Sequence, residues 1–162
     1  MKAKNIIVVI SIVFNIILIT YIFWRESHLR EIYSGLSFGL QGDLVQLESI
    51  IDYQMNNKWN DENTVLEKME DVTEGIHQLM VTGKNAGMIT KSQESDLWTL
   101  YKYFANFPTF TGFPNSKLDN HGINELIQLR DDLRSAGWGT NLGYSSDWES
   151  FSMKIKDLTN QM

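Results

Sequence analysis

The 162-residue sequence contains no cysteine and only two prolines. Without cysteine the chain forms no disulfide, offers no thiolate nucleophile or cysteine-based zinc site, and carries no lipid on an N-terminal cysteine. Its histidines, His28, His77 and His121, are widely scattered, so we expect neither a zinc cluster nor any other metal or cofactor site. Both prolines fall within residues 108–114, which leaves the rest of the chain free of the residue that most strongly interrupts helices.

Positive charge is also scarce. The chain has 14 basic and 20 acidic residues. Lys2 and Lys4 lie before a long apolar run and every acidic residue lies after it, so the chain beyond residue 24 carries a formal charge of −8. Such an acidic domain repels the phosphates of nucleic acids. We therefore expect no nucleic-acid partner.

The apolar run covers residues 6–24 and contains no charged side chain. As a helix, at about 1.5 Å per residue, it measures roughly 28 Å, which is close to the hydrocarbon thickness of a bilayer. Tyr21, Phe23 and Trp24 end the run with rings that favour the membrane–water interface. The run is longer than the apolar core of a cleaved signal peptide, and no small-x-small pair follows it at the proper distance. We predict an uncleaved transmembrane signal anchor.

An anchor at this position divides the chain into a short cytoplasmic tail, residues 1–5, the anchor itself, residues 6–24, and an extracytoplasmic domain, residues 25–162. The orientation depends on a small bias in basic residues, because Lys2, Lys4 and the terminal amine precede the run while Arg25 and Arg30 follow it. We expect the N-terminus in the cytoplasm. Asn15, polar within the apolar run, is a candidate for a hydrogen bond to a neighbouring helix in the membrane.

The spacing of apolar residues predicts helix almost throughout residues 25–162. Apolar residues recur at three- and four-residue steps from Leu29 to Met55, and similar stripes follow in residues 65–79, 97–104, 123–133 and 148–158. No segment has a convincing strand pattern and no internal repeat is present. We predict an all-α fold, in which the N-terminal transmembrane helix is followed by an antiparallel bundle of four to five helices.

Short-range signals place the ends of these helices. Asn60 or Asp61 is expected to cap the second helix and Gly83 to end it, whereas Thr90 and Gln93 match a capping box for the third. Gly137 is expected to stop the fourth helix. For the last helix, Ser146 is the predicted N-cap and Glu149 its capping-box partner.

Gly35, Gly39 and Gly42 fall on one side of the first helix, away from its leucine stripe. Small residues at four-residue spacing allow two helices to approach closely, so these glycines could form the seam of a homodimeric stalk. We favour the other interpretation, in which glycine, at up to about 1 kcal/mol each, loosens or interrupts the helix. Asp43 would then cap a restarted helix.

The segment around the two prolines is rich in aromatic residues, because Phe104, Phe107, Phe110 and Phe113 recur every three residues across a helix end and a loop. We expect the loop to fold over the end of its own bundle. The functional alternative is an apolar patch for a partner protein, a lipid headgroup region or a hydrophobic ligand. Trp138 belongs to a second predicted aromatic cluster, with Tyr144 and Trp148.

No catalytic motif rises above background. Glu74 and His77 match the Glu-x-x-His pattern of di-iron bundles, but such a site needs a second copy and further carboxylates. Residues 137–143 lack the lysine and the preceding strand of a phosphate-binding loop. We therefore expect no intrinsic catalysis.

These observations lead to a functional expectation. The chain is predicted to be a membrane-anchored extracytoplasmic helical interaction or regulatory module that acts on a cell-envelope protein partner. The alternative is a ligand-sensing or lipid-binding helical bundle with the aromatic loop at its mouth. Besides the bilayer and an envelope protein, a homodimer through residues 35–42 is the remaining expected partner.

Overall fold

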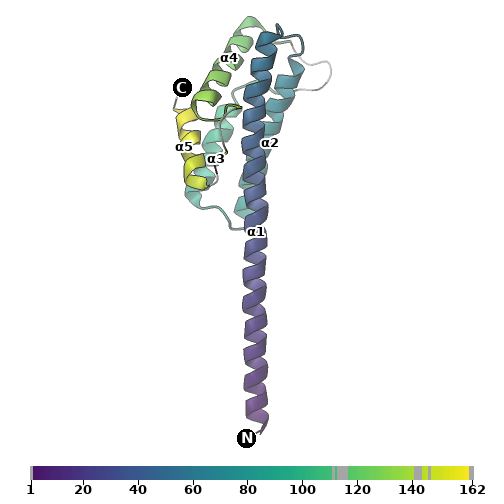
Figure 1. Ribbon diagram of the computed structural model, residues 1–162, viewed down its shortest axis with the longest axis vertical. Helices are drawn as coiled ribbons and strands as arrows, with labels where there is room; N and C mark the ends of the chain where they lie inside the picture. The colour runs from purple at the N-terminus through teal and green to yellow at the C-terminus, as the bar shows by residue number, and fades with distance from the viewer. Residues whose placement is uncertain (1, 111, 113–116, 141–143, 146, 161–162) are drawn as a thin grey trace.

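The computed structural model describes residues 2–110, 112, 117–140, 144, 145 and 147–160, with side chains from residue 5 onward. Five helices make up the fold: α1 (Lys2–Asn56), α2 (Asn63–Asn85), α3 (Lys91–Phe104), α4 (Asn120–Ser135) and α5 (Trp148–Thr159). Figure 1 shows them as a bundle on one end of a long helix, with the N-terminus at the far tip. The predicted all-α bundle with an apolar N-terminal helix is confirmed.

Helix α1 is a single uninterrupted helix of 55 residues, about 82 Å long at 1.5 Å per residue. The favoured prediction that the glycines interrupt it, with Asp43 capping a new helix, is wrong. Leu40, Leu44 and Leu47 on the opposite face are buried among the other helices. That packing outweighs the propensity cost of Gly35 and Gly39, because most helical stability in proteins comes from burial.

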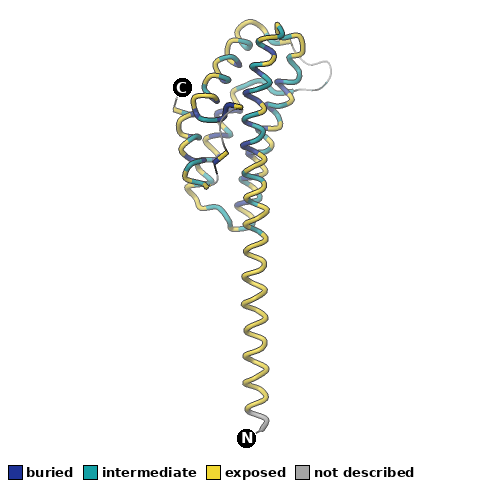
Figure 2. Tube along the Cα trace, viewed as in Figure 1, coloured by how far each residue is buried: buried dark blue, intermediate teal, exposed yellow. Residues whose placement is uncertain are grey.

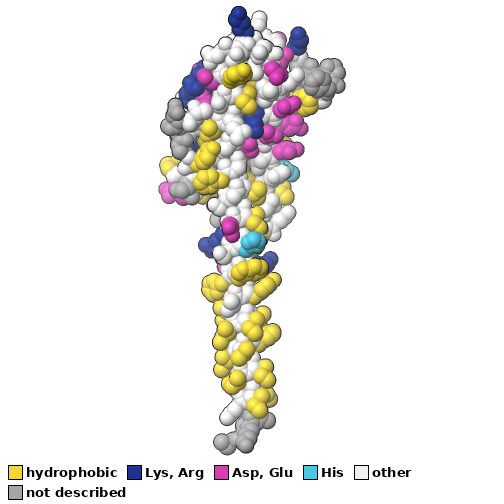
Figure 3. Space-filling model, turned by 45° about the vertical axis from the view of Figure 1, so that its right-hand side comes forward, with side chains coloured by type: hydrophobic (Ala, Val, Ile, Leu, Met, Phe, Trp, Pro, Cys, Tyr) yellow, Lys and Arg dark blue, Asp and Glu magenta, His cyan; other side chains and the backbone are white. Residues whose placement is uncertain are grey.

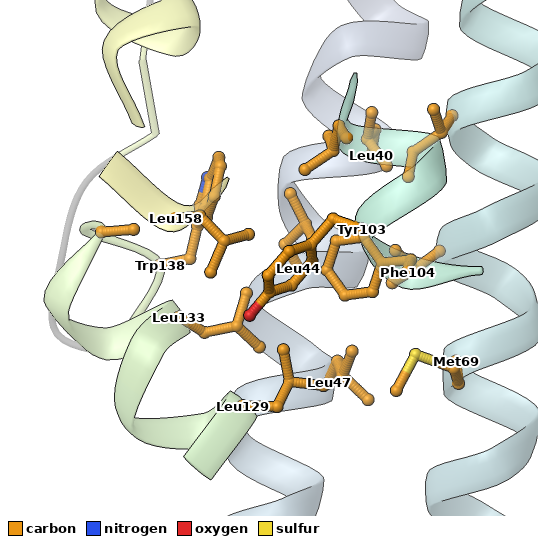
Figure 4. Packing of buried hydrophobic residues seen from close by; sticks show 14 of the residues in the cluster. Leu40, Leu44, Leu47, Met69, Tyr103, Phe104, Leu129, Leu133, Trp138 and Leu158 are labelled. Carbon is orange, nitrogen blue, oxygen red and sulfur yellow. The ribbon is translucent and has the colours of Figure 1, made fainter. Parts of the chain in front are cut away.

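The core lies between the C-terminal half of α1 and the other four helices. The helices whose backbones lie closest follow the cyclic order α1, α2, α3, α5, α4 and back to α1. Figure 4 shows side chains of all five elements and the adjoining loop meeting in the centre, with Leu44 and Leu47 from α1 opposite Tyr103, Phe104 and Leu133. The leucine stripe predicted for α1 is therefore the wall of this core from Leu40 to Ile51.

A charged contact joins α1 to α4 beside the core. Glu48 is fully buried, and its Oε1 accepts a hydrogen bond from Arg134 Nε at 2.6 Å. One turn away, Asp52 Oδ1 accepts from Arg130 at 3.1 Å and from Arg134 at 3.3 Å. The spacing of four residues on each helix brings both acids and both arginines onto facing sides. This network fixes the register of α4 along α1.

The turn between α1 and α2 is held by the side chain of Gln54. Its Oε1 accepts from the Asp61 backbone N–H at 3.2 Å, and its Nε2 donates to Thr64 Oγ1 at 3.3 Å. Helix α2 begins at Asn63 with Glu62 in the capping position and no side-chain cap bond. The predicted caps, Asn60 and Asp61, are wrong, because the turn held by Gln54 continues through Asp61 and the helix begins only at Asn63.

Two helices end in glycine turns. Helix α2 runs past Gly83 to Asn85, and Gly87 forms the turn beyond it, where a φ of 66° allows Gly87 N–H to reach Lys84 O and Met88 N–H to reach Gly83 O. Gly83 was the wrong choice because a close contact requires it there. A Cβ at that position would lie 2.7 Å from both Tyr33 and Ile89. The stop predicted at Gly137 is confirmed by the same bond pattern.

The remaining helix starts carry side-chain caps. Thr90 and Gln93 form the predicted capping box at α3. Asp119 caps α4 by accepting from Gly122 N–H at 2.8 Å. At α5 the cap is Asp147, which accepts from Ser150 N–H at 2.9 Å and whose pKa is lowered by that bond. The prediction of Ser146 was one residue early, and Ser146 itself lies outside the described residues.

Candidate functional site at the distal end of the bundle

The bundle has two unlike ends (Figure 1). We call the end that faces the apolar half of α1 the proximal end. The distal end comprises the α1–α2 turn, residues 57–62, the described residues between α3 and α4, 105–110, 112 and 117–119, and the first turn of α4. The Leu118 backbone N–H donates to the Glu62 carboxylate at 3.1 Å, which ties two of these parts together. Phe107 and Phe110 therefore lie away from the apolar half of α1.

Phe107 is wedged against the core rather than free. It is half-buried, and its ring centroid lies 5.6 Å from that of Tyr103 and 6.4 Å from that of Phe104. Phe110 is also half-buried. Phe113 lies outside the described residues. For Phe107 the observed packing follows the interpretation in which the loop covers its own bundle.

The support beneath Phe107 is rigid. Tyr103 is buried at the end of α3, and its hydroxyl donates to Asp132 Oδ2 on α4 at 3.4 Å. Burial, and after it the negative charge and hydrogen bond of Asp132, raise the pKa of Tyr103. Tyr103 is therefore a neutral donor at physiological pH, and it links the two helices that flank the aromatic segment.

The α1–α2 turn carries backbone strain. Lys58 and Trp59 have φ angles of 58° and 54°, in the left-handed region that non-glycine residues rarely occupy. Each such residue costs on the order of 1 kcal/mol, and bulky Trp59 is held there by packing against the core. Strain of this kind concentrates at functional sites. The sequence gives no signal for it, since neither residue is glycine or asparagine.

Trp138, a candidate for a partner or ligand surface whose cluster we expected rather to cap the bundle, is fully buried. The glycine turn at Gly137 directs it inward, where its ring packs edge-on against Phe151 with centroids 6.1 Å apart. It therefore contributes to the core and not to a binding surface. The second aromatic cluster also divides, because Tyr144 pairs with Phe38 of α1 instead, at 5.5 Å between centroids.

The residues singled out on α1 lie far from the distal end. Gly35 and Gly39 are exposed, and a Cβ on either would meet no atom within 4 Å. A Cβ on Gly42 would lie 3.6 Å from the hydroxyl of Tyr144. Asn15 Nδ2 donates to Ser11 O at 2.8 Å, so its side chain has a partner within its own helix. Helix–helix contact through these residues stays a prediction.

Glu74 and His77 are exposed on α2, where they line a pocket of about 320 Å³ together with Tyr101. Within the described residues, no group of three histidine, aspartate or glutamate side chains is arranged to hold a metal ion. The distal end thus offers apolar and hydrogen-bonding contacts, and we assign it no chemical step.

The chain was compared with family models, curated proteins and solved structures. No family model, no curated protein and no solved structure shows a significant match to this chain.

Proposed function

We propose that this chain is a membrane-anchored interaction module that holds a helical bundle beside a bilayer and offers its distal end to a protein partner. The observation that carries the proposal is the continuity of α1. Residues 5–28 of this helix are exposed on all sides, whereas the same helix is buried in the core from Leu40 onward. Among the described helices, α1 is the one long and apolar enough to cross a membrane, by length and composition.

A rigid connection between anchor and core sets the height of the distal end. From Trp24 to Asn56, α1 rises about 48 Å at 1.5 Å per residue. With residues 6–24 in the bilayer, Phe107 and Phe110 at the distal end lie well above the lipid headgroups. This geometry favours a protein partner over the lipid surface among the alternatives that the sequence left open.

The chemistry of the distal end suits a protein contact. The distal end combines half-buried Phe107 and Phe110 with exposed polar residues, among them Lys58, Asn60 and Lys117. An apolar centre with a polar rim is the common anatomy of protein–protein interfaces. The Lys58–Trp59 strain agrees with a turn shaped for contact.

Topology is tested by using the absence of cysteine. A single cysteine introduced as Ala3→Cys or Asn60→Cys reacts with a membrane-impermeant maleimide in intact cells only if it lies outside. We expect labelling at position 60 and none at position 3 until the membrane is permeabilised. The reverse pattern would invert the orientation, and loss of the chain from membranes after alkaline extraction would overturn the anchor.

The partner surface is tested by cross-linked pull-down of the intact chain from native membranes. We expect Phe110→Ser with Phe113→Ser to remove a specific partner while thermal stability stays nearly unchanged. Met153→Ser, which removes an exposed apolar side chain from α5, serves as the control and should retain the partner. A large fall in melting temperature in the phenylalanine variant would show that the loop is structural, and the proposal would fail there.

A further inference from the structure

The proximal end contains a groove that the proposed protein contact does not use. Two pockets, of about 450 and 530 Å³, adjoin there and share Arg30 of α1 and Met88 of the α2–α3 loop. The first is lined on α1 by Tyr21, Ile22, Arg25, Glu26 and Leu29. It therefore begins on the apolar run itself, and the second pocket continues into the bundle.

The wall of the second pocket is polar and incompletely bonded. Tyr33, Ser34 and Ser37 of α1 line it together with Ser145 and Trp148. Ser145 is nine-tenths buried, and neither its Oγ nor the hydroxyl of Tyr33 has a hydrogen-bond partner in the described part of the chain. A buried hydroxyl without a partner costs about 1–3 kcal/mol. Both of these atoms are shielded from solvent, so the hydroxyls of this wall that a ligand can meet are those of Ser34 and Ser37.

Arg25 and Arg30 both line the first pocket, together with Glu26, and Arg30 also lines the second. Arg30 is bound to Glu26 at 2.7 Å, whereas Arg25 has no hydrogen bond or ion pair among the described residues. Figure 3 shows charged side chains gathered at the level where α1 leaves its apolar half, on a molecule that is otherwise acidic beyond residue 24. A guanidinium at the end of a membrane-spanning helix lies at the depth of lipid phosphates.

The far wall limits the ligand further. Asp147 lines the second pocket, and the bonds from Ser150 lower the pKa of its carboxyl, so it is negative at neutral pH. A second anionic group in this pocket would be repelled, whereas a hydroxyl can donate to a carboxylate. Ser34 follows Arg30 by four residues on α1, a rise of about 6 Å, so a phosphate held at Arg30 places a short headgroup beside the serines of the second pocket.

We propose that this groove binds a phospholipid of the surrounding bilayer that carries one phosphodiester and a hydroxylated headgroup. The phosphate lies between Arg25 and Arg30, an acyl chain runs along Ile22 and Leu29, and the headgroup hydroxyls reach Ser34 and Ser37. The inference rests on the proposed insertion of residues 6–24. It adds a lipid ligand at the proximal end to the protein contact proposed at the distal end.

The test measures the melting temperature of the full chain in a neutral detergent with added lipid. Phosphatidylglycerol should raise it by about 5 °C, since a ligand that binds only the folded state stabilises it. Phosphatidylcholine, which lacks headgroup hydroxyls, and soluble glycerol 1-phosphate, which lacks acyl chains, should raise it by less than about 1 °C. Equal shifts with both lipids would overturn the headgroup assignment, and a shift with glycerol 1-phosphate would assign a free phosphate ester instead.

Variants locate the effect. Arg25→Gln should abolish the shift with phosphatidylglycerol, whereas Lys156→Gln, an equal change of charge at an exposed position of α5, should leave it intact. Ser37→Phe fills the second pocket without a change of charge and should also abolish it. Recovery in alkali-extracted membranes is measured for each variant. Loss of the chain from membranes refutes the anchor, whereas a membrane-bound chain without a lipid-specific shift refutes this inference alone.

Discussion

The two halves of α1 differ in everything except their backbone. In the N-terminal half, apolar side chains point in every direction and all are exposed from Asn5 to His28. In the C-terminal half, burial recurs at Leu40, Leu44, Leu47 and Ile51, with polar residues between them. Figure 2 shows the change along the tube, from uniformly exposed to alternating. One helix thus carries two patterns that suit two different surroundings.

Each half of α1 is stable only in surroundings that match its apolar pattern. A helix that is apolar all round is stable only when something covers every side, as a bilayer does. A helix with a single apolar stripe needs a partner on one side only, and α2 and α4 supply it. The boundary between the two patterns coincides with the charged residues 25–31, so the anchor and the bundle wall are distinct in chemistry but continuous in structure.

We expect the largest difference between the two halves of α1 when one leucine in each is replaced by alanine and the free energies of unfolding are compared. Leu44→Ala should lower the free energy of unfolding of the bundle by about 3 kcal/mol, because it removes buried contacts and leaves a cavity. Leu18→Ala, the same substitution in the exposed half, should leave that free energy unchanged within about 0.5 kcal/mol. Chemical denaturation of both variants in detergent gives the two values. Equal losses would show that the apolar half is packed within the folded bundle.

A second pair compares ion pairs. Arg134→Ala removes the partner of fully buried Glu48 and should cost about 2 kcal/mol, since the carboxylate loses a charge-assisted hydrogen bond. Glu26→Ala breaks the exposed pair with Arg30 and should cost less than about 0.5 kcal/mol. Unfolding of each at low and high salt provides the check. A similar cost for both would mean that Glu48 is reached by water.

The fold was largely predictable because its signals are local or periodic. The stripe on α1, the capping box at Thr90 and the stop at Gly137 each depend on side chains within one or two turns of one another. Predictions failed where a residue outside the helix in question decides the outcome. Gln54 of α1 holds the turn that delays the start of α2, and contacts with Tyr33 and Ile89 explain why Gly83 lies inside that helix.

The candidate sites were less predictable for the same reason. Phe107 and Phe110 were identified by composition, but their place at the distal end depends on how five helices are arranged. The sequence alone allowed Trp138 either to bind a partner or to cap the bundle. The turn at Gly137 directs its ring into the core. The proximal groove joins α1 to the loop at Met88 and to Ser145, and no spacing along the chain shows that these meet.

The smallest expected changes in the free energy of unfolding come from replacing glycine by alanine. They compare a packed position, Gly83, with an open one on the outer face of α1, Gly39. At Gly83 an added Cβ would lie 2.7 Å from Tyr33 and Ile89, so Gly83→Ala should lower the free energy of unfolding by about 1 kcal/mol or more. At Gly39 it would meet nothing, so Gly39→Ala should raise that free energy by about 0.5–1 kcal/mol through helix propensity alone. The two substitutions are chemically the same. The sign of the change in free energy depends only on whether a residue of another helix or loop occupies the space that the new Cβ would take.

Measured across a range of protein concentrations, Gly39→Ala also tests the homodimeric stalk. If a second copy packs against residues 35–42, the variant becomes less stable, and increasingly so at the concentrations where the wild-type dimer forms. A gain that is independent of concentration shows that this face of α1 packs against nothing, and leaves the distal end and the proximal groove as the surfaces where partners bind.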